Sequence, residues 1–258
     1  MQRAADIERV GFEGIWVGDS LGRAAWPAPD ILLWLTAAAA STQHVELGTT
    51  VLQVPLRHPV ELAQRFMSLH ALSGGRFRAG VGSGSTRADF DAVGVPYEDR
   101  FKILAAALPT IRKLCAGERV GDAYLPAWAD TGSGPPMLIG SWHSGIWVQR
   151  AARDYDGWIA SGFFTSFNQL KEGLQRYRDA GGQRALVSTI RIDLHKPTTP
   201  FDPDGSFSLE CEPAEAADRL QRLADIGYDD ALLTRANHSA DDLTDDDLEE
   251  IRALVPRG

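Results

Sequence analysis

The sequence predicts an α/β fold of short parallel strands that alternate with helices, most simply a TIM-type (β/α)8 barrel. The apolar runs are short and continuous, as expected for strands that are covered on both faces, and helical stretches separate them. The segment from Leu72 to Gly84 combines a helix end, a Gly74-Gly75 turn, a buried strand and a glycine-rich loop. The same order of elements recurs along the chain.

Local signals mark several element boundaries. Pro29 and Asp30 indicate the start of the second helix, and Pro59 indicates that of the third. Thr244 and Asp247 have capping-box spacing before the last helix. In chain order, helices are expected at residues 4–10, 30–41, 59–72, 101–116, 146–153, 167–180, 213–226 and 245–255. Strands are expected at residues 14–17, 45–50, 77–81, 137–139, 157–160, 185–194 and 230–233.

The strand count leaves a gap in the expected barrel. Seven strands are predicted, whereas a closed (β/α)8 barrel needs eight, and the missing strand would precede Ala4. Either the chain is an N-terminal truncation or the barrel closes differently, through a filling segment, a partner subunit or direct pairing of strands 14–17 and 230–233. A doubly wound sheet is the rival fold, but residues 14–22 lack its phosphate fingerprint. We expect one domain, 1–258.

Composition narrows the class of protein. The 258 residues are 44% hydrophobic, enough for a large core, and the net charge of -9 argues against nucleic-acid or anionic-membrane partners. Cys115 and Cys211 have no metal-ligand spacing, so we expect buried thiols, a reducing compartment and no metal. No apolar run reaches the roughly 18 residues of a membrane span, and no signal sequence is visible, which makes a cytoplasmic location the default.

Five segments in order carry a resemblance to a known family. They are Gly-Phe-Glu-Gly-Ile-Trp-Val-Gly-Asp at 11–19, Val-Glu-Leu-Gly-Thr-Thr-Val at 45–51, Pro-Leu-Arg-His-Pro at 55–59, Leu-Ser-Gly-Gly-Arg at 72–76 with Gly-Val-Gly-Ser-Gly at 80–84, and Asp-Gly-Trp at 156–158. With these segments the chain resembles the bacterial luciferase-like monooxygenases, strongly from Gly11 to Trp158 and weakly beyond.

This resemblance implies a fold, a cofactor and a reaction class. The family folds as a (β/α)8 barrel and uses FMN or the deazaflavin coenzyme F420. It implies a flavin- or F420-dependent oxidoreductase or monooxygenase that acts on a small organic substrate. The Gly-Thr-Thr-Val and Ser-Gly-Gly-Arg segments look most like the F420 branch, with FMN as the alternative. The family often dimerises, so a homodimer is an expected assembly.

The candidate cofactor site lies where the predicted strands end, because barrel active sites form at the carboxyl ends of strands. Small, hydroxyl and glycine residues at these ends suit a flat ring and a phosphate, and the resemblance implies a non-prolyl cis peptide between Thr50 and Val51. Residues 141–145 lead into a predicted helix and would bind phosphate there. The expected cofactor-binding residues are Thr49, Thr50, Val51, Gly82, Ser83, Gly84, Gly140, Ser141, Ser144 and Gly145.

Asp19 and His143 are the candidate catalytic residues. Histidine is a common proton carrier in catalysis, which makes His143 the best candidate for that role, although a phosphate contact or solvation is an alternative interpretation. Family members of the F420 type place Asp-His where this chain has Asp19 and Ser20, so the family's general base is lost and Asp19 could simply cap its loop. The alternative function is therefore a catalytically impaired member that binds a flavin or an apolar ligand without turnover.

Flanking features are expected to support the site. Arg57 and Arg76 would brace strand ends through ion pairs, and His58 would help to dock the helix that follows it. Long loops rich in Gly, Pro, Asp and Ser are predicted at 117–136 and 196–212. Together with residues 18–29 they would supply the substrate contacts.

Overall fold

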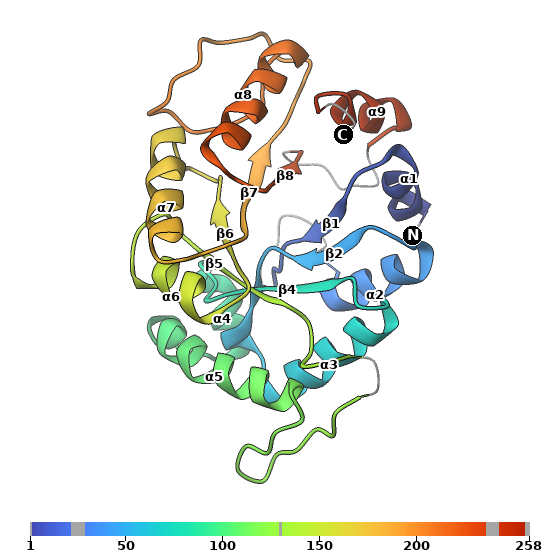
Figure 1. The fold of residues 1–258 in the computed structure, drawn as a ribbon, viewed down its shortest axis with the longest axis vertical. Helices are drawn as coiled ribbons and strands as arrows, with labels where there is room; N and C mark the ends of the chain where they lie inside the picture. The colour runs from blue at the N-terminus through green and yellow to red at the C-terminus, as the bar shows by residue number, and fades with distance from the viewer. Residues whose placement is uncertain (1, 22–28, 129–130, 236–242, 256–258) are drawn as a thin grey trace. The chain divides into compact units, whose positions relative to one another are not determined.

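The computed structural model describes residues 2–21, 29–128, 131–235 and 243–255. Its contacts divide the chain into two compact units. Unit 1 is essentially Glu13–Met137, and unit 2 joins Gln2–Phe12 to Leu138–Gly258. Each unit carries parallel strands with helices packed beside them, as the alternating sequence pattern predicts (Figure 1).

Unit 1 contains a parallel sheet in the order β1-β2-β4, and the short β3 also pairs with β4. The strands are β1 (Gly14–Val17), β2 (Glu46–Thr49), β3 (Leu52–Gln53) and β4 (Phe77–Gly82). The helices are α2 (Ile31–Ser41), α3 (Pro59–Leu72), α4 (Arg87–Val93) and α5 (Arg100–Cys115), with 3-10 turns η1 (Val54–Leu56) and η2 (Tyr97–Asp99).

Side-chain caps begin two of these helices where the sequence indicates. The Asp30 carboxylate accepts hydrogen bonds from the backbone N–H groups of Leu32 and Leu33, which satisfies donors that the first turn of α2 leaves free. His58 caps α3, because its Nδ1 accepts from the N–H of Val60. The expected docking role of His58 is thus a capping role.

Arg76 braces the turn before β4, and the contacts that do so are hydrogen bonds to neutral oxygens, whereas ion pairs were expected. Its guanidinium donates to the carbonyl oxygens of Ala39, Thr42 and Val45, and also to the Thr42 hydroxyl. These contacts tie the carboxyl end of α2 to the start of β2. Arg76 therefore supports the end of the sheet opposite the strand carboxyl ends.

Unit 2 contains a second run of parallel strands in the order β5-β6-β7-β8. The strands are β5 (Met137–Ser141), β6 (Gly157–Ser161), β7 (Ala185–Arg191) and β8 (Asp230–Thr234). The helices are α6 (Ile146–Asp154), α7 (Phe167–Asp179), α8 (Pro213–Ile226), α9 (Asp245–Arg252) and the N-terminal α1 (Gln2–Val10).

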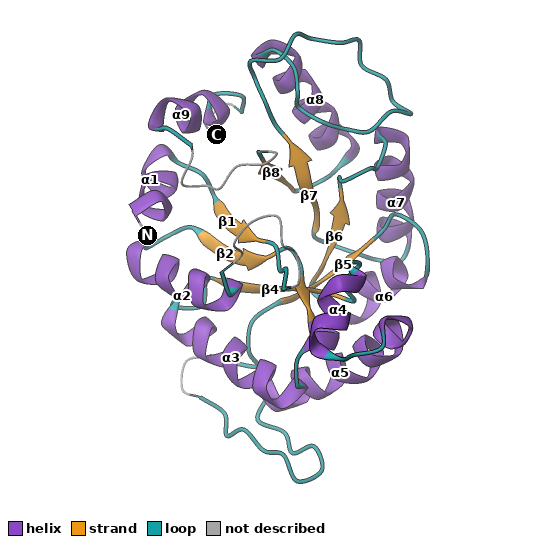
Figure 2. Ribbon diagram, turned by 180° about the vertical axis from the view of Figure 1, so that it is seen from behind, coloured by secondary structure: helices purple, strands orange, loops and turns teal. Residues whose placement is uncertain are grey.

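The first and last helices lie side by side in unit 2 (Figures 1 and 2). Arg3 and Arg9 both bind the carboxylate of Asp245, and Arg252 donates to the carbonyl of Gly11. The pKa of the Asp245 carboxyl is lowered, and the largest cause is the hydrogen bond from Arg3. The capping box predicted for α9 is confirmed, with Thr244 and Asp247 exchanging both hydrogen bonds.

The long loop at 196–212 is anchored in unit 2 rather than free. Arg219, on α8, donates to the carbonyl oxygens of Ser208 and Thr199. Phe207 lies in the loop and is buried, and its ring packs against Phe167 of α7. These contacts hold both halves of the loop against the helices.

One strand and one α-helix of the described residues were not predicted, and one prediction about the edge strands is not tested. The missed elements are β3 and α4. Among the described residues, β1 pairs with β2 and β8 pairs with β7, so each has one strand neighbour. The filling segment, partner or direct pairing expected beside β1 and β8 stays a prediction.

The two thiols are buried and free, as expected. Burial raises the pKa of Cys115 to about 11 and also raises that of Cys211. Thiolates are the reactive form of cysteine, so Cys115 behaves as a packing residue. None of the helices in the described ranges is both long and apolar enough to cross a membrane.

Candidate functional site

The carboxyl ends of β1, β2 and β4 are tied together in unit 1. The peptide bond between Thr50 and Val51 is cis, which confirms the expectation for this position. The Thr49 hydroxyl donates to the Gly80 carbonyl of β4 at 2.6 Å, and the N–H of Thr50 donates to the Val17 carbonyl of β1 at 2.8 Å. Three of the predicted cofactor residues thus lie on a well-connected strand end.

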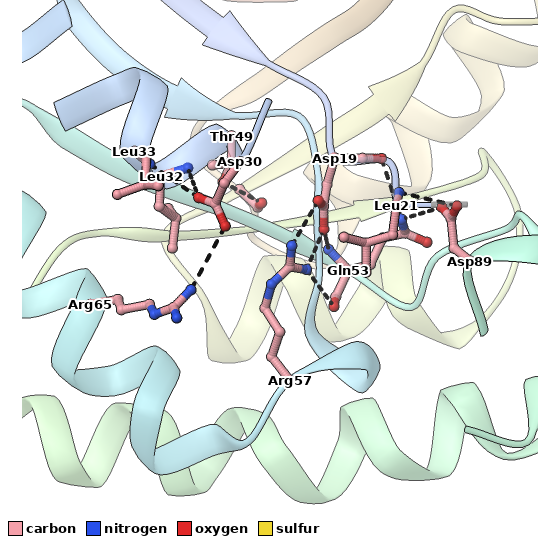
Figure 3. A network of polar contacts seen from close by, with 11 residues as sticks. Asp19, Leu21, Asp30, Leu32, Leu33, Thr49, Gln53, Arg57, Arg65 and Asp89 are labelled. Atoms are coloured by element: carbon pink, nitrogen blue, oxygen red, sulfur yellow. Dashed lines mark hydrogen bonds and ion pairs between the residues drawn. The ribbon is translucent and has the colours of Figure 1, made fainter. Parts of the chain in front are cut away.

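Asp19 follows β1 and forms a two-pronged ion pair with Arg57. The Arg57 Nη1 and Nη2 atoms lie 2.5 and 2.9 Å from the two Asp19 carboxylate oxygens (Figure 3). The Asp19 side chain is 3% exposed and that of Arg57 is 11% exposed. The brace predicted for Arg57 therefore exists, and its partner is one of the two candidate catalytic residues.

The Gly82–Gly84 loop packs directly against Gln53. Gly84 has a φ of +77°, and a Cβ built on it would lie 2.3 Å from the Gln53 Oε1 atom and 3.0 Å from the Phe90 ring. Glycine is favoured at this position because the positive φ strains other residues and a Cβ would force the Gln53 side chain to move. The loop can therefore present backbone groups at close range, as the sequence predicts.

Three buried oxygen atoms near these strand ends have no hydrogen-bond partner among the described residues. They are Ser20 Oγ, Thr50 Oγ1 and Gln53 Oε1. Buried polar atoms are normally paired, so unpaired ones at a strand end favour a ligand that completes them. The two hydroxyl groups and the amide oxygen suit a ligand that offers both hydrogen-bond donors and acceptors.

Unit 2 contains the predicted phosphate segment, which lies between β5 and α6. The indole Nε1 of Trp158 donates to the Ser141 hydroxyl at 3.0 Å, which holds the start of the segment. Gly145 precedes α6 with a φ of +104°, no side chain caps the helix, and a Cβ on Gly145 would meet nothing within 4 Å. An uncapped helix start with open space suits a phosphate group.

His143 lies against α7 in unit 2. A Cβ built on Gly173 of α7 would lie 2.9 Å from both the Cα and the Cβ of His143. Its Nδ1 atom is buried without a hydrogen-bond partner in the described part of the chain. Its position supports a role in packing the 141–145 segment, and its catalytic role stays a prediction.

A sequence profile described as luciferase-like monooxygenase matches residues 1–192. An F420-dependent glucose-6-phosphate dehydrogenase from Beutenbergia cavernae is 42% identical over 247 aligned residues, which cover 87% of this chain and 70% of the relative. The chain belongs to the luciferase-like monooxygenase family.

Other members of the luciferase-like family match over shorter lengths. The 4-hydroxyprotoasukamycin monooxygenase of Streptomyces nodosus subsp. asukaensis is 31% identical over 153 residues, and the match spans 55% of this chain and 41% of that relative. The limonene 1,2-monooxygenase of Rhodococcus erythropolis is 31% identical over 161 residues, with 54% and 41% covered. The family thus contains both F420-dependent dehydrogenases and monooxygenases.

Solved luciferase-like structures show the same fold. The F420-dependent tetrahydromethanopterin reductase of Methanopyrus kandleri has a TM-score of 0.78 at 17% identity, covering 98% of this chain and 93% of that one. The oxygenating constituent of 3,6-diketocamphane monooxygenase from Pseudomonas putida, in complex with FMN, has a TM-score of 0.78 at 16% identity, with 98% and 91% covered. The predicted fold class, α/β of the luciferase-like TIM-barrel type, is confirmed.

Two buried polar residues that hydrogen-bond to the segment after β1 were missed by the sequence analysis. Gln53 and Asp89 are 4% and 0% exposed and contact the segment around Asp19. Gln53 lies three residues beyond the expected strand at 45–50, which is a weak signal, and no helix or strand is predicted around Asp89. No group of three or more metal-ligating side chains occurs in the described ranges.

Proposed function

We propose that this protein is an oxidoreductase that binds coenzyme F420 and acts on a small organic substrate. The main support is the 42% identity to an F420-dependent dehydrogenase over most of the chain. Further F420-dependent relatives, from Kineococcus radiotolerans and Nakamurella multipartita, are 32% and 35% identical over 80% and 92% of the chain. FMN is the alternative cofactor, since monooxygenases also match. We further propose that residues 1–258 act as one cytoplasmic catalytic domain that assembles as a homodimer.

The residues at the strand ends fit such a cofactor. The hydroxyls of Ser20 and Thr50, which have no hydrogen-bond partner in the described ranges, would hydrogen-bond the ring or the substrate beside it. The uncapped start of α6 would hold a phosphate through backbone N–H groups. We propose Thr49, Thr50, Val51, Gly82, Ser83 and Gly84 for the ring, and Gly140, Ser141, Ser144 and Gly145 for the phosphate.

The protein's part in the reaction is to bind, orient and exclude water. When bound, a deazaflavin supplies a hydride donor or acceptor at C5 of its ring. The Ser20 hydroxyl is a poor proton acceptor near neutral pH, so we propose that it hydrogen-bonds a substrate oxygen instead of taking a proton. Asp19 and His143 remain the proposed catalytic residues. Because Asp19 forms an ion pair with Arg57, we propose that Asp19 contributes by orienting the loop that follows β1.

A fluorescence titration tests the proposal. The purified protein should bind F420 with a dissociation constant in the micromolar range, seen as quenching of the cofactor's fluorescence. It should bind FMN less tightly than F420. Tighter binding of FMN would reassign the cofactor, and no binding of either at tenfold higher concentration would remove the proposed function. Tight F420 binding without turnover of any small organic substrate tested would favour the alternative, a ligand-binding member without turnover. Ser20, in the place of the family's histidine, supports this alternative.

Replacing Gly145 tests the phosphate position, with FMN and riboflavin as probes. The Gly145→Ala change forces a side chain into a backbone conformation that only glycine adopts readily, at a cost of about 1–3 kcal/mol. We expect FMN binding to weaken by about tenfold or more and riboflavin binding to change little. Isothermal calorimetry measures both.

The matched control for this change is Gly181→Ala. Gly181 has a φ of +91° and, like Gly145, nothing within 4 Å of a built Cβ, but it follows α7. It should carry similar strain without affecting either probe. Equal losses for FMN and riboflavin in Gly145→Ala would place the phosphate elsewhere.

A further inference from the structure

Helix α4 places a buried carboxylate beside the segment that follows β1. Asp89, in the first turn of α4, is fully buried. One of its oxygens accepts from the N–H of Leu21 at 3.2 Å, and the other accepts from Gln53 Nε2 at 2.7 Å (Figure 3). A single side chain therefore contacts both the segment after β1 and strand β3.

Gln53 completes the connection to Asp19. Its backbone N–H donates to the Asp19 carboxylate at 3.0 Å, and its Nε2 atom also lies 3.3 Å from the Asp19 carbonyl oxygen. Asp89 thus bonds the segment directly at Leu21 and, through Gln53, at Asp19. Ser20 lies between these two attachment points, with its hydroxyl buried and unpartnered among the described residues.

The helix that carries Asp89 is itself firmly held within unit 1. Phe90 is fully buried and packs edge-to-face on Tyr97, with ring centroids 5.2 Å apart. The Tyr97 hydroxyl donates to the Ser85 carbonyl, and the Arg100 guanidinium stacks 3.9 Å from the Tyr97 ring centroid. This packing gives Asp89 a rigid base from which to hold the neighbouring segment.

We infer that Asp89 is a positioning residue that fixes the Asp19-Ser20-Leu21 segment in its ligand-ready conformation. Asp89 would act without touching cofactor or substrate. Hydrogen bonds to an ionised carboxylate are about twice as strong as neutral ones, so two of them restrict the segment effectively. If a ligand binds only when this segment is ordered, its affinity falls in proportion to the fraction of protein molecules in which the segment is ordered. The effect on ligand affinity rests on the proposed function, whereas the hold on the segment does not.

Two variants of Asp89 test this inference. Asp89→Ala removes both acceptors, and Asp89→Asn keeps one oxygen for Leu21. In the protein without cofactor, hydrogen exchange at the Leu21 amide should be about tenfold faster in Asp89→Ala, with Asp89→Asn in between. In the titration with F420, the dissociation constant should rise by about tenfold in Asp89→Ala, corresponding to an ordered fraction near one tenth, and again less in Asp89→Asn.

Two controls separate positioning from general loss of stability. Glu98→Gln removes an exposed carboxylate from η2, where it pairs with Arg87 of α4. Ile111→Val, in the core of α5, should cost about 0.5–1.5 kcal/mol without touching the Asp19-Ser20-Leu21 segment. Both should leave Leu21 exchange and F420 affinity unchanged under conditions where all variants are folded.

The outcomes distinguish the two proposals. Unchanged Leu21 exchange in Asp89→Ala, or faster exchange with unchanged F420 affinity, would overturn the positioning role. Equal effects in Ile111→Val would also overturn it. If the unaltered protein binds neither F420 nor FMN, the proposed function fails, and the exchange rates alone then decide whether Asp89 holds the segment.

Discussion

Replacing Arg57 by methionine is expected to lower the free energy of unfolding by about 3–5 kcal/mol. The change leaves the Asp19 carboxylate, 3% exposed, without its two-pronged partner. Within the described part of the chain, the Asp19 carboxylate would keep only the hydrogen bond from the Gln53 N–H, and a buried charge with so little compensation is strongly disfavoured. Urea unfolding followed by circular dichroism measures the loss.

Two further variants identify the cause of that loss. In the Asp19→Asn/Arg57→Met double variant no charge stays buried alone, so the loss should be clearly smaller than in Arg57→Met. Arg57→Lys keeps the charge but not the fork of donors, and we expect an intermediate loss. A loss below about 1 kcal/mol in Arg57→Met would mean that the pair behaves like an exposed ion pair.

Replacing Gly84 by alanine should weaken F420 binding by more than tenfold and also lower stability. The new Cβ would lie 2.3 Å from Gln53 Oε1 and 3.0 Å from Phe90, and the φ of +77° would add strain. The Gln53 side chain must therefore shift, which disturbs its Nε2 hydrogen bonds to the Asp89 carboxylate and the Asp19 carbonyl oxygen. The fluorescence titration and the unfolding midpoint measure both effects.

Gly94→Ala is the matched control for this change. Gly94 ends α4 with a φ of +72°, and a Cβ there would meet nothing within 4 Å. Its cost should be the strain alone, about 1 kcal/mol, with normal F420 affinity. If both variants bind F420 equally well, close packing of Gly84 against Gln53 does not matter for the site.

The polar network explains why these positions matter together. Residues from four parts of unit 1 meet in it: Asp19 after β1, Gln53 in β3, Arg57 after η1, and Asp89 in α4 (Figure 3). The network holds its own members by hydrogen bonds while the Ser20 and Thr50 hydroxyls beside it find no partner among the described residues. A preorganised segment with unsatisfied hydroxyls is what a ligand-binding strand end requires.

Several elements could be predicted because their signals are local. The predicted bounds of α3 and α8 agree with the structure, and both helices begin at a proline, at Pro59 and Pro213. The α8 helix also ends before Gly227, which has a left-handed conformation. The capping box at the start of α9 could be predicted for the same reason, because Thr244 and Asp247 lie within one stretch of four residues.

Other elements could not be predicted because they depend on distant partners. Strand β3 has two residues, too few for any periodicity, and it exists because β4 pairs with it. Helix α4 has seven residues, and its packing comes from Tyr97 and the segment around Gln53. A short helix is marginal alone, so its sequence carries little signal.

The sequence by itself determined the alternation of strands and helices and the family, because these follow from short-range patterns and recognisable segments. It also supplied the proposal that the cofactor binds at the strand ends. Only the tertiary structure decided which side chains meet. Asp19 and Arg57 are 38 residues apart, and Leu21 and Asp89 are 68 apart. Their pairing depends on the packing of β1, β3 and α4, and a buried charge is stable only where that packing brings its partner within reach.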